Sequence, residues 1–463
     1  MFFISKDNDF SKGSVSKSIL KLAVPMTLAQ LINILYNIVD RMYIGRIPNA
    51  SSLALTGVGV TFPIITIIMA FANLYGMGGA PLCSIERGKG NNKKAEEIMG
   101  NSFTLLMITG LILTIIILIF KKPLLYLLGA SDNTFSYAND YITIYLLGSV
   151  FVMISLGMNS FINSQGFGRI GMMTILVGAI TNIILDPIFI FLLRMGVKGA
   201  ALATIFSQFL SALWVLHFLC SNDAILKLKK KYFKINIIHL KNIISLGLSG
   251  FIMAITNSIV QMVCNVTLQS YGGDLYVGVM TVLNSIREIV MMPVHGITSA
   301  SQPVLGFNFG AKKYKRVKSA IKFSSISCIA YTTSIWLLLM IFPKFFIKLF
   351  NNEADLITLG THCMNIYFFG FFMMSLQMSA QSIYVALGES KKAIFFSLLR
   401  KIIIVVPLTI LLPRLFNLGT NGVFLAEPIS NFIGGLATYS TMILTVWKNL
   451  SIEIKKENEY IML

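Results

Sequence analysis

Long uncharged apolar runs follow one another along this chain, and they limit the folds it can adopt more than any other feature. The run from Ile98 to Phe120 carries no charged residue. At about 1.5 Å per residue, a helix of that length crosses a bilayer core of about 30 Å. The chain is 55% apolar and only 12% charged, too little polar surface to cover a soluble globule of 463 residues. The sequence therefore predicts an all-α integral membrane protein.

Twelve of these runs are expected to be transmembrane helices. They cover residues 18–42, 53–82, 97–120, 138–162, 170–193, 199–220, 242–268, 275–307, 319–342, 357–384, 393–413 and 421–446. About two thirds of the 38 Lys and Arg residues then lie on the side that holds both termini. That excess predicts cytoplasmic termini in a cell membrane, and its distribution argues against a nucleic-acid partner although the formal net charge is +19.

The two halves of the chain repeat each other at an offset of roughly 220 residues. Pro81 and Gly88 meet Pro303 and Gly310 in this register, and further equivalent residues follow. These are Asn33 with Asn257, Pro187 with Pro407, Gly196 with Gly419 and Gly199 with Gly422. Each half has six spans, an even number, so the halves share one orientation and form a parallel repeat about an axis along the membrane normal. We expect an N-lobe at 1–220, a basic, solvated cytoplasmic linker at 221–238 and a C-lobe at 239–463.

The fifth span places a carboxylate, Asp186, inside an apolar run. A charged side chain at the centre of a membrane helix costs roughly 2.5 to 3.5 kcal/mol, so such residues usually face a cavity or a pathway. Asn182, four positions earlier, shares its helix face. In the first span, polar side chains recur along one face at every third or fourth position, and this face must point at protein or water. They are Gln30, Asn33, Asn37 and Asp40.

Counting from the charges that flank the spans places Asp40, Asp186 and Thr204 at a common depth, roughly 9 to 12 Å below the outer rim. Two carboxylates in one low-dielectric pocket do not both ionise easily, so the pair is expected to hold a proton or bind sodium. The competing interpretation is that the two acids lie on opposite sides of their lobe. We expect no cofactor, with the proton or sodium acting only as a coupling ion.

The second half carries different residues at the equivalent positions. Cys264 stands where the repeat places Asp40, and Val406 where it places Asp186. The charges within the C-lobe spans are Arg287, Glu288, Arg400, Lys401 and Glu427. Opposite charges at similar depth more often neutralise each other than titrate, so a structural ion-pair network is expected, with Glu427 as a second titrating candidate. The substrate cavity is expected to be lined by Gln30, Asn33, Asn37, Asn257, Gln261, Gln377 and Gln381.

Histidine and cysteine give little support to enzyme chemistry. The 5 cysteines lack the C-x-x-C spacing of metal or redox sites, and the 4 histidines are scattered. No protein-bound metal is expected apart from a possible sodium ion at the two acids. An integral-membrane transferase remains an alternative, but it would need acids and histidines clustered at one membrane face.

Together these residues resemble the multidrug and toxic compound extrusion family over all twelve spans. The resemblance rests on Asn37 to Arg46, Gly88 to Asn91, and Asn182 to Pro187 followed by Gly196 to Gly199. The segment from Gln302 to Ala311 is similar to the MepA-like exporters of Gram-positive bacteria.

This resemblance implies a non-enzymatic, monomeric, cation-coupled antiporter that expels amphipathic, often cationic, drugs through the plasma membrane. Some prokaryotic branches of the family use an acid pair for ion coupling. The resemblance to these branches implies that the coupling residues of this chain are Asp40, Asn182, Asp186 and Thr204. A flippase for a lipid-linked oligosaccharide is the runner-up, but it would need a cavity lined with arginines.

Overall fold

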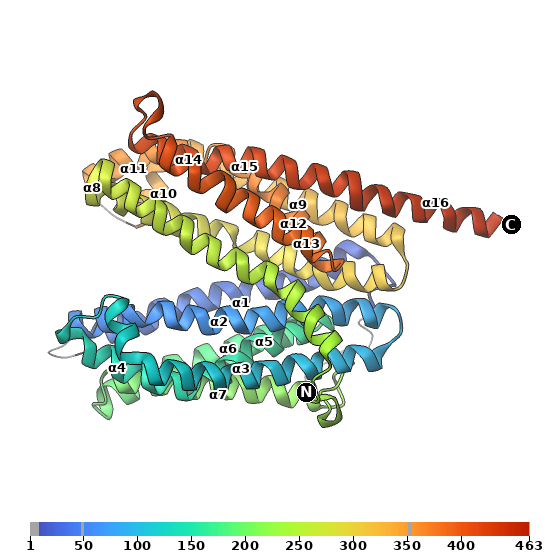
Figure 1. Cartoon of the computed structure of the whole chain (residues 1–463), viewed down its shortest axis with the longest axis horizontal. Helices are drawn as coiled ribbons and strands as arrows, with labels where there is room; N and C mark the ends of the chain where they lie inside the picture. The colour runs from blue at the N-terminus through green and yellow to red at the C-terminus, as the bar shows by residue number, and fades with distance from the viewer. Residues whose placement is uncertain (1–8, 48–50, 351–352, 463) are drawn as a thin grey trace. The chain divides into compact units, whose positions relative to one another are not determined.

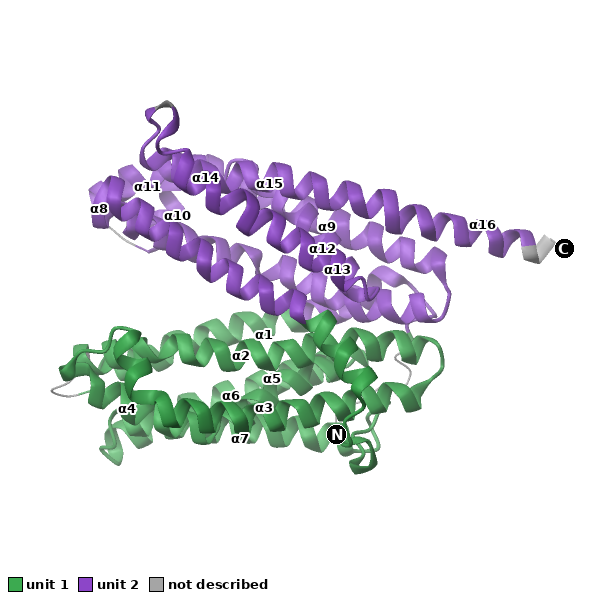
Figure 2. Cartoon of the chain, viewed as in Figure 1, with its two compact units in different colours: residues 1–9, 25–247 green, residues 10–24, 248–463 purple. Residues whose placement is uncertain are grey.

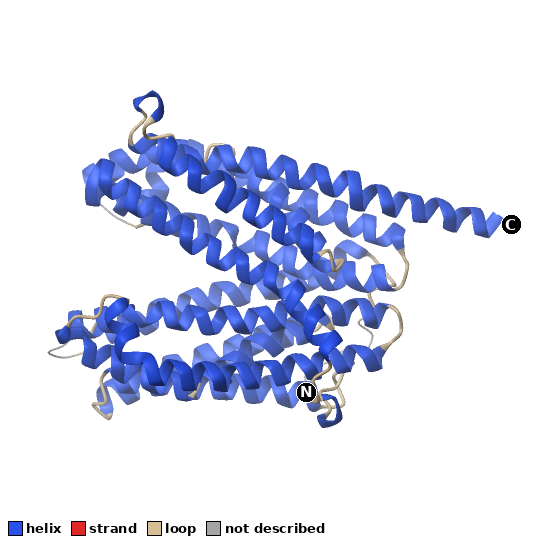
Figure 3. Cartoon of the chain, in the orientation of Figure 1, coloured by secondary structure: helices blue, strands red, loops and turns tan. Residues whose placement is uncertain are grey.

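The computed structural model describes residues 9–47, 51–350 and 353–462, and all of its regular elements are helices (Figures 1 and 3). The chain divides into two compact units (Figure 2). Unit 1 comprises Met1–Asp9 and Pro25–Gly247, and unit 2 comprises Phe10–Val24 and Leu248–Leu463.

Helices of very different length follow one another along the chain. The first half of the chain contains α1 (Val15–Ile44), α2 (Ser51–Gly88), α3 (Asn92–Leu127), α4 (Asp132–Leu147), α5 (Ser149–Ser164), α6 (Gly168–Pro187), the π-helix η1 (Ile188–Leu192), α7 (Val197–Cys220) and the 3₁₀ helix η2 (Lys230–Tyr232). The remainder contains α8 (Ile237–Gly310), α9 (Tyr314–Ile341), α10 (Pro343–Lys348), α11 (Ala354–Tyr367), α12 (Phe371–Ala386), α13 (Ser390–Leu398), the π-helix η3 (Leu399–Val405), α14 (Val406–Leu411), the 3₁₀ helix η4 (Leu415–Asn417), α15 (Thr420–Met442), the π-helix η5 (Ile443–Trp447) and α16 (Lys448–Met462).

Two bends between neighbouring helices and one break inside α8 account for the predicted number of spans. Within the described residues, 9 helices are long and apolar enough to cross a membrane, or 11 when two bent pairs each count as one span. The 74-residue helix α8 is far longer than a bilayer is thick, and it is interrupted at Gly273, whose φ is 70°. Counting α8 as two spans gives the twelve transmembrane helices expected from the sequence.

The two bent spans occur at the same place in each repeat. Helices α4 and α5 meet at 56° around Gly148, and α11 and α12 meet at 51° before Phe371. A Cβ atom on Gly148 would lie 2.2 Å from the side chain of Ile205 on α7, so glycine lets α7 pack closely against the bend. The apolar run continues through both bends, so the sequence predicts one span for each pair. Hydropathy therefore predicted the spans but not their breaks.

The repeat is visible in the backbone at the start of the last helix of each half. Gly196, before α7, has φ 54° and ψ −130°, and Gly419, before α15, has φ 52° and ψ −132°. Such a positive φ favours glycine. Three residues later, a Cβ on Gly199 or Gly422 would lie 2.7 or 2.6 Å from the backbone of the preceding helical segment. Gly196 and Gly419 thus share a backbone conformation, and Gly199 and Gly422 share a close contact with the preceding backbone. The glycines that the sequence aligns have equivalent roles in the two halves.

Phe10–Val24 belongs to unit 2, whereas the sequence predicts one lobe over residues 1–220. The side chain of Arg316 donates to the carbonyl oxygens of Phe10, Lys12 and Gly13, at 2.8 to 3.0 Å. Asn308 also donates to the Phe10 carbonyl, at 3.0 Å. These long-range bonds explain why residues 10–24 group with the second half, and sequence spacing gives no sign of them.

The linker at 221–238 is packed against the rest of unit 1, so the prediction that it is a solvated tether is wrong. Asn101 on α3 donates to the carbonyls of Tyr232 and Lys234 and accepts from the backbone N–H of Asn236 at 2.6 Å. Glu96, also on α3, forms an ion pair of 2.6 Å with Lys229. Buried apolar side chains complete the contact: Ala224, Leu226, Leu228 and Tyr232.

Candidate functional site

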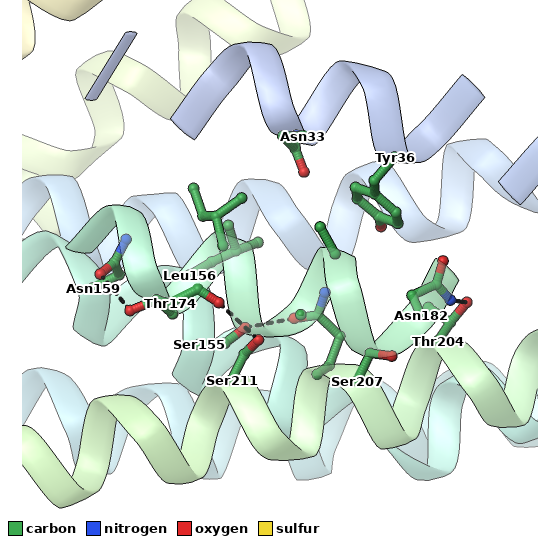
Figure 4. Close-up of a pocket in the computed structure, with 14 residues that line it drawn as sticks. Asn33, Tyr36, Ser155, Leu156, Asn159, Thr174, Asn182, Thr204, Ser207 and Ser211 are labelled. Atoms are coloured by element: carbon green, nitrogen blue, oxygen red, sulfur yellow. Dashed lines mark hydrogen bonds between the residues drawn. The ribbon is translucent and has the colours of Figure 1, made fainter. Parts of the chain in front are cut away.

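A polar pocket lies within unit 1 between α1, α5, α6 and α7 (Figure 4). Its empty volume is about 570 Å³, including the solvent at its mouth. The polar side chains that line it are Asn33, Tyr36, Ser155, Asn159, Thr174, Asn182, Thr204, Ser207, Gln208 and Ser211. No Lys or Arg and no carboxylate is among its lining residues. The pocket therefore offers neutral hydrogen-bonding groups over most of its length.

Hydrogen bonds between neighbouring helices hold these polar side chains in place. Ser155 on α5 donates to Gln208 of α7 at 2.7 Å, and Thr174 on α6 donates to Asn159 of α5 at 3.1 Å. Ser211 on α7 donates to the carbonyl of Thr174 at 3.0 Å. The three helices are thus tied together by their polar faces, which explains why serine, threonine and amide side chains stand in otherwise apolar spans.

The two acids that the sequence places at one depth lie together in the structure. Asp186 follows Asn182 by one turn of α6, and Asp40 follows Tyr36 by one turn of α1. Tyr36 and Asn182 line the same pocket, so the next turn of each helix brings Asp40 and Asp186 close enough to interact electrostatically. The segments that follow the two acids also touch, because the rings of Tyr43 and Phe191 pack edge to face with centroids 6.3 Å apart. The arrangement with the acids on opposite sides of the lobe is therefore excluded.

Asn182 connects the acid pair to the pocket. Its amide nitrogen donates to Asp186 at 3.3 Å and to the hydroxyl of Thr204 at 3.5 Å. Thr204 in turn donates to the carbonyl of Ala200 at 3.0 Å. Asn182 is 1% exposed and Asp186 is completely buried. All four residues expected to act in coupling, Asp40, Asn182, Asp186 and Thr204, therefore form one cluster.

Three oxygen atoms of this cluster are buried and have no hydrogen-bond donor among the described residues. They are Oδ1 of Asp40, Oδ1 of Asn182 and Oδ2 of Asp186. A buried carboxylate without a donor is costly, and a proton on one acid or a bound cation would remove that cost. The cluster therefore has the composition of a site for a proton or a small hard cation, for which oxygen is the preferred ligand.

Two tyrosines near the acids were not predicted. Tyr36 lines the pocket from α1, and Tyr141 approaches Thr204 from α4. Tyr36 precedes Asp40 by four residues and so shares its helix face, a signal that the sequence contained. Nothing in the spacing indicated Tyr141, because it comes from a different, bent span.

The predicted substrate-cavity residues fall in different places. Asn33 lines the pocket of unit 1, whereas Gln30 and Asn37 line neither pocket described here. Asn257 and Gln261 line a second pocket, within unit 2. Gln377 and Gln381 are buried, and Gln377 donates to the carbonyl of Phe396 at 3.4 Å.

The charges of the second half converge on one carboxylate in unit 2. Oxygen Oε1 of Glu427, on α15, lies 3.5 Å from Nη1 of Arg287, 3.3 Å from Nη1 of Arg400 and 3.3 Å from Nζ of Lys401. Arg400 also donates to the side-chain oxygen of Asn431. Arg400 and Lys401 are adjacent in the chain, and both lie in the π-helical segment η3. We refer to Arg287, Arg400, Lys401 and Glu427 as the C-lobe cluster.

Glu288 is not part of the C-lobe cluster, so the prediction that it joins the ion-pair network is wrong. Its side chain is exposed and forms no ion pair with any described residue. Consecutive residues of an α-helix point about 100° apart, so when Arg287 faces Glu427 its neighbour must face away. The cluster consequently contains three basic groups and one acid.

Comparison with known proteins agrees with this architecture. The family model described as MatE matches residues 25–188 and 249–411, one segment in each repeat. The multidrug export protein MepA of Staphylococcus haemolyticus is 26% identical over 453 residues, covering 96% of this chain and 98% of the relative. MepA of Staphylococcus aureus strain MSSA476 is 25% identical over 411 residues, covering 88% of this chain and 90% of the relative. These matches confirm the MepA-like resemblance.

Solved structures show the same fold. A crystal structure of MATE in complex with MaL6 has a TM-score of 0.88 at 23% identity, covering 96% of this chain and 98% of that one. An outward-facing multidrug resistance MATE family transporter of the MOP superfamily also has a TM-score of 0.88 at 23% identity, covering 98% and 100%. With the family model matched in both halves, the chain belongs to the MatE family of multi-pass membrane transporters.

Proposed function

We propose that this transporter exports amphipathic, often cationic, small molecules from a bacterial cell by exchanging them for protons or sodium ions. The observation that carries the proposal is the pair Asp40 and Asp186, buried together with oxygen atoms that lack donors among the described residues. MepA relatives named as multidrug export proteins support the substrate class. The basic excess on one side supports cytoplasmic termini and export toward the other side.

The coupling cycle needs the ion at the acid pair and the drug in the adjoining pocket to bind in alternation, not together. A cation or proton that enters from outside neutralises Asp40 and Asp186, and the altered hydrogen bonds of Asn182 and Thr204 change the shape of the adjoining pocket. The drug, whose binding depends on that pocket, then leaves, and the ion is released inside by alternating access. Asn33 and Tyr36 contact the drug in the N-lobe pocket, with Gln30, Asn37, Asn257, Gln261, Gln377 and Gln381 along its path.

The test is ethidium efflux from proteoliposomes that carry the full-length protein, with a proton gradient and a sodium gradient imposed separately. Efflux should follow one gradient and identify the coupling ion. Asp186→Asn removes an acid from the pair, and Asp140→Asn is the matched control, because Asp140 pairs with Lys198 outside the pocket. Full gradient-driven efflux by a folded Asp186→Asn variant would refute the coupling role. Absence of any such efflux from the folded wild type would favour a lipid-linked oligosaccharide flippase.

A further inference from the structure

The C-lobe cluster contains more positive than negative charge in a buried place. Arg400 and Lys401 are 3% and 4% exposed, and Glu427, at 5%, is the one acid among the described residues that pairs with them. Arg287 adds a third cation at 3.5 Å from the same oxygen atom. One carboxylate cannot neutralise three cations. Buried charges that lack a partner are costly, so a further negative group would stabilise this arrangement.

A pocket within unit 2 opens onto this excess charge. Arg287, Lys401 and Glu427 line it, together with the polar side chains of Asn257, Gln261, Asn284, Tyr367 and Thr409. Its empty volume is about 390 Å³, including the solvent at its mouth, smaller than the pocket of unit 1. The apolar side chains that narrow it are Val260, Met280, Val405 and Val423. The pocket suits a compact charged group better than a whole amphiphile.

The neutral groups of this pocket also favour an anion. The hydroxyl of Tyr367 donates to Oδ1 of Asn284 at 3.1 Å, and both amide N–H groups of Asn284 remain available as donors. The guanidinium of Arg287 lies 6.0 Å from the centre of the Tyr367 ring, at the limit of a cation–π contact. Lys401 has three N–H donors and one hydrogen-bond partner among the described residues, Glu427. Lys401 therefore keeps N–H donors for a further acceptor in the pocket.

We propose that the C-lobe pocket binds a small monovalent anionic group between Arg287 and Lys401. The shared chemistry is that of a halide ion and of a carboxylate carried by an amphiphilic ligand. Glu427 limits the affinity, because it competes for the same cations, and it restricts the site to one negative charge. The anion would neutralise part of the positive charge of the cluster. By pairing with both Arg287 and Lys401, it would also link the second half of α8 to η3.

Direct binding to the purified full-length protein tests this proposal independently of transport. Radioactive chloride is titrated onto protein held in gluconate buffer, and saturable binding of about one ion per chain is expected. Arg287→Gln and Lys401→Gln should each weaken that binding at least about tenfold. Lys392→Gln removes a cation outside the pocket and should leave it unchanged, since Lys392 pairs with Glu389.

A second variant separates loss of the site from loss of folding. Glu427→Gln removes the competing acid, so chloride should bind more tightly, the opposite of what a damaged protein would show. Acetate and octanoate then identify the source of the anion. Competition by both carboxylates indicates a ligand carboxylate, and competition by neither indicates a free halide. No saturable binding to folded wild type, or binding that persists unchanged in Arg287→Gln, would overturn the proposal.

Discussion

The two halves of this transporter build different pockets on a repeated backbone: a neutral one beside an acid pair, and one lined by basic side chains. In the first half, Asp40 and Asp186 lie together and no Lys or Arg lines the adjoining pocket. In the second half, Cys264 and Val406 occupy the equivalent positions, and Arg287 and Lys401 line the pocket instead. The glycine conformations before α7 and α15 are nearly identical. The fold therefore fixes where a pocket forms, whereas a few side chains decide which sign of charge it accepts.

The largest expected effect is on transport, when the first half loses one of its two acids. Asp186→Asn should abolish gradient-driven ethidium efflux while the variant remains folded, because one carboxylate can no longer share a proton or cation with a second. Efflux in proteoliposomes measures this, with Asp140→Asn as the control. Loss of efflux in both variants would mean that the acid pair has no special role.

Removing the acid of the C-lobe cluster should act on stability. Glu427→Gln leaves three buried cations without their shared carboxylate, and breaking a buried pair in this way costs about 3–5 kcal/mol. The free energy of unfolding in detergent should fall accordingly, and chloride should restore part of it. An unchanged stability in anion-free buffer would show that the cluster carries less charge than its composition implies.

The glycines shared by the halves should respond alike. Gly199→Ala and Gly422→Ala each place a Cβ within 2.7 Å of backbone atoms, so each should destabilise the protein by about 1–3 kcal/mol. Gly59→Ala is the matched control, because a Cβ there meets nothing within 4 Å. Thermal unfolding measures the three variants. A large difference between Gly199→Ala and Gly422→Ala would break the structural equivalence.

The smallest effect on stability is expected when the second half receives the acid of the first. Cys264→Asp places a carboxylate in the pocket beside Arg287 and Lys401, where it would replace the proposed anion. Thermal stability should be little changed, and chloride affinity should fall about tenfold. Undiminished chloride binding in this variant would place the anion elsewhere.

Much of the fold followed from periodic features of the sequence. Hydropathy predicted the twelve spans, and the aligned glycines predicted a repeat that the backbone reproduces at Gly196 and Gly419. The breaks at Gly148 and before Phe371 were not predictable in this way, because they depend on what each glycine packs against rather than on polarity.

Residue spacing predicted which side chains of the candidate sites share a helix face and a depth in the membrane. It did not predict which side chains of different helices meet. Depth placed Asp40 and Asp186 in one layer, but only the structure showed that they meet. Glu288 was assigned to the wrong partner group because a position in the chain does not reveal which way a side chain points. The convergence of Arg287, Arg400 and Lys401 on one oxygen atom depends on three separate helical segments.

The packed linker has a practical consequence for protease digestion. A segment with lysines at 227, 229, 230, 231 and 234 is where trypsin would ordinarily separate two halves of a protein. Here the backbone from Leu226 to Asn236 is held by Gln165, Glu96 and Asn101, so a protease cannot draw it into an extended conformation without first breaking those bonds. Brief digestion of the folded transporter should therefore trim other exposed sites first and leave the two halves covalently joined.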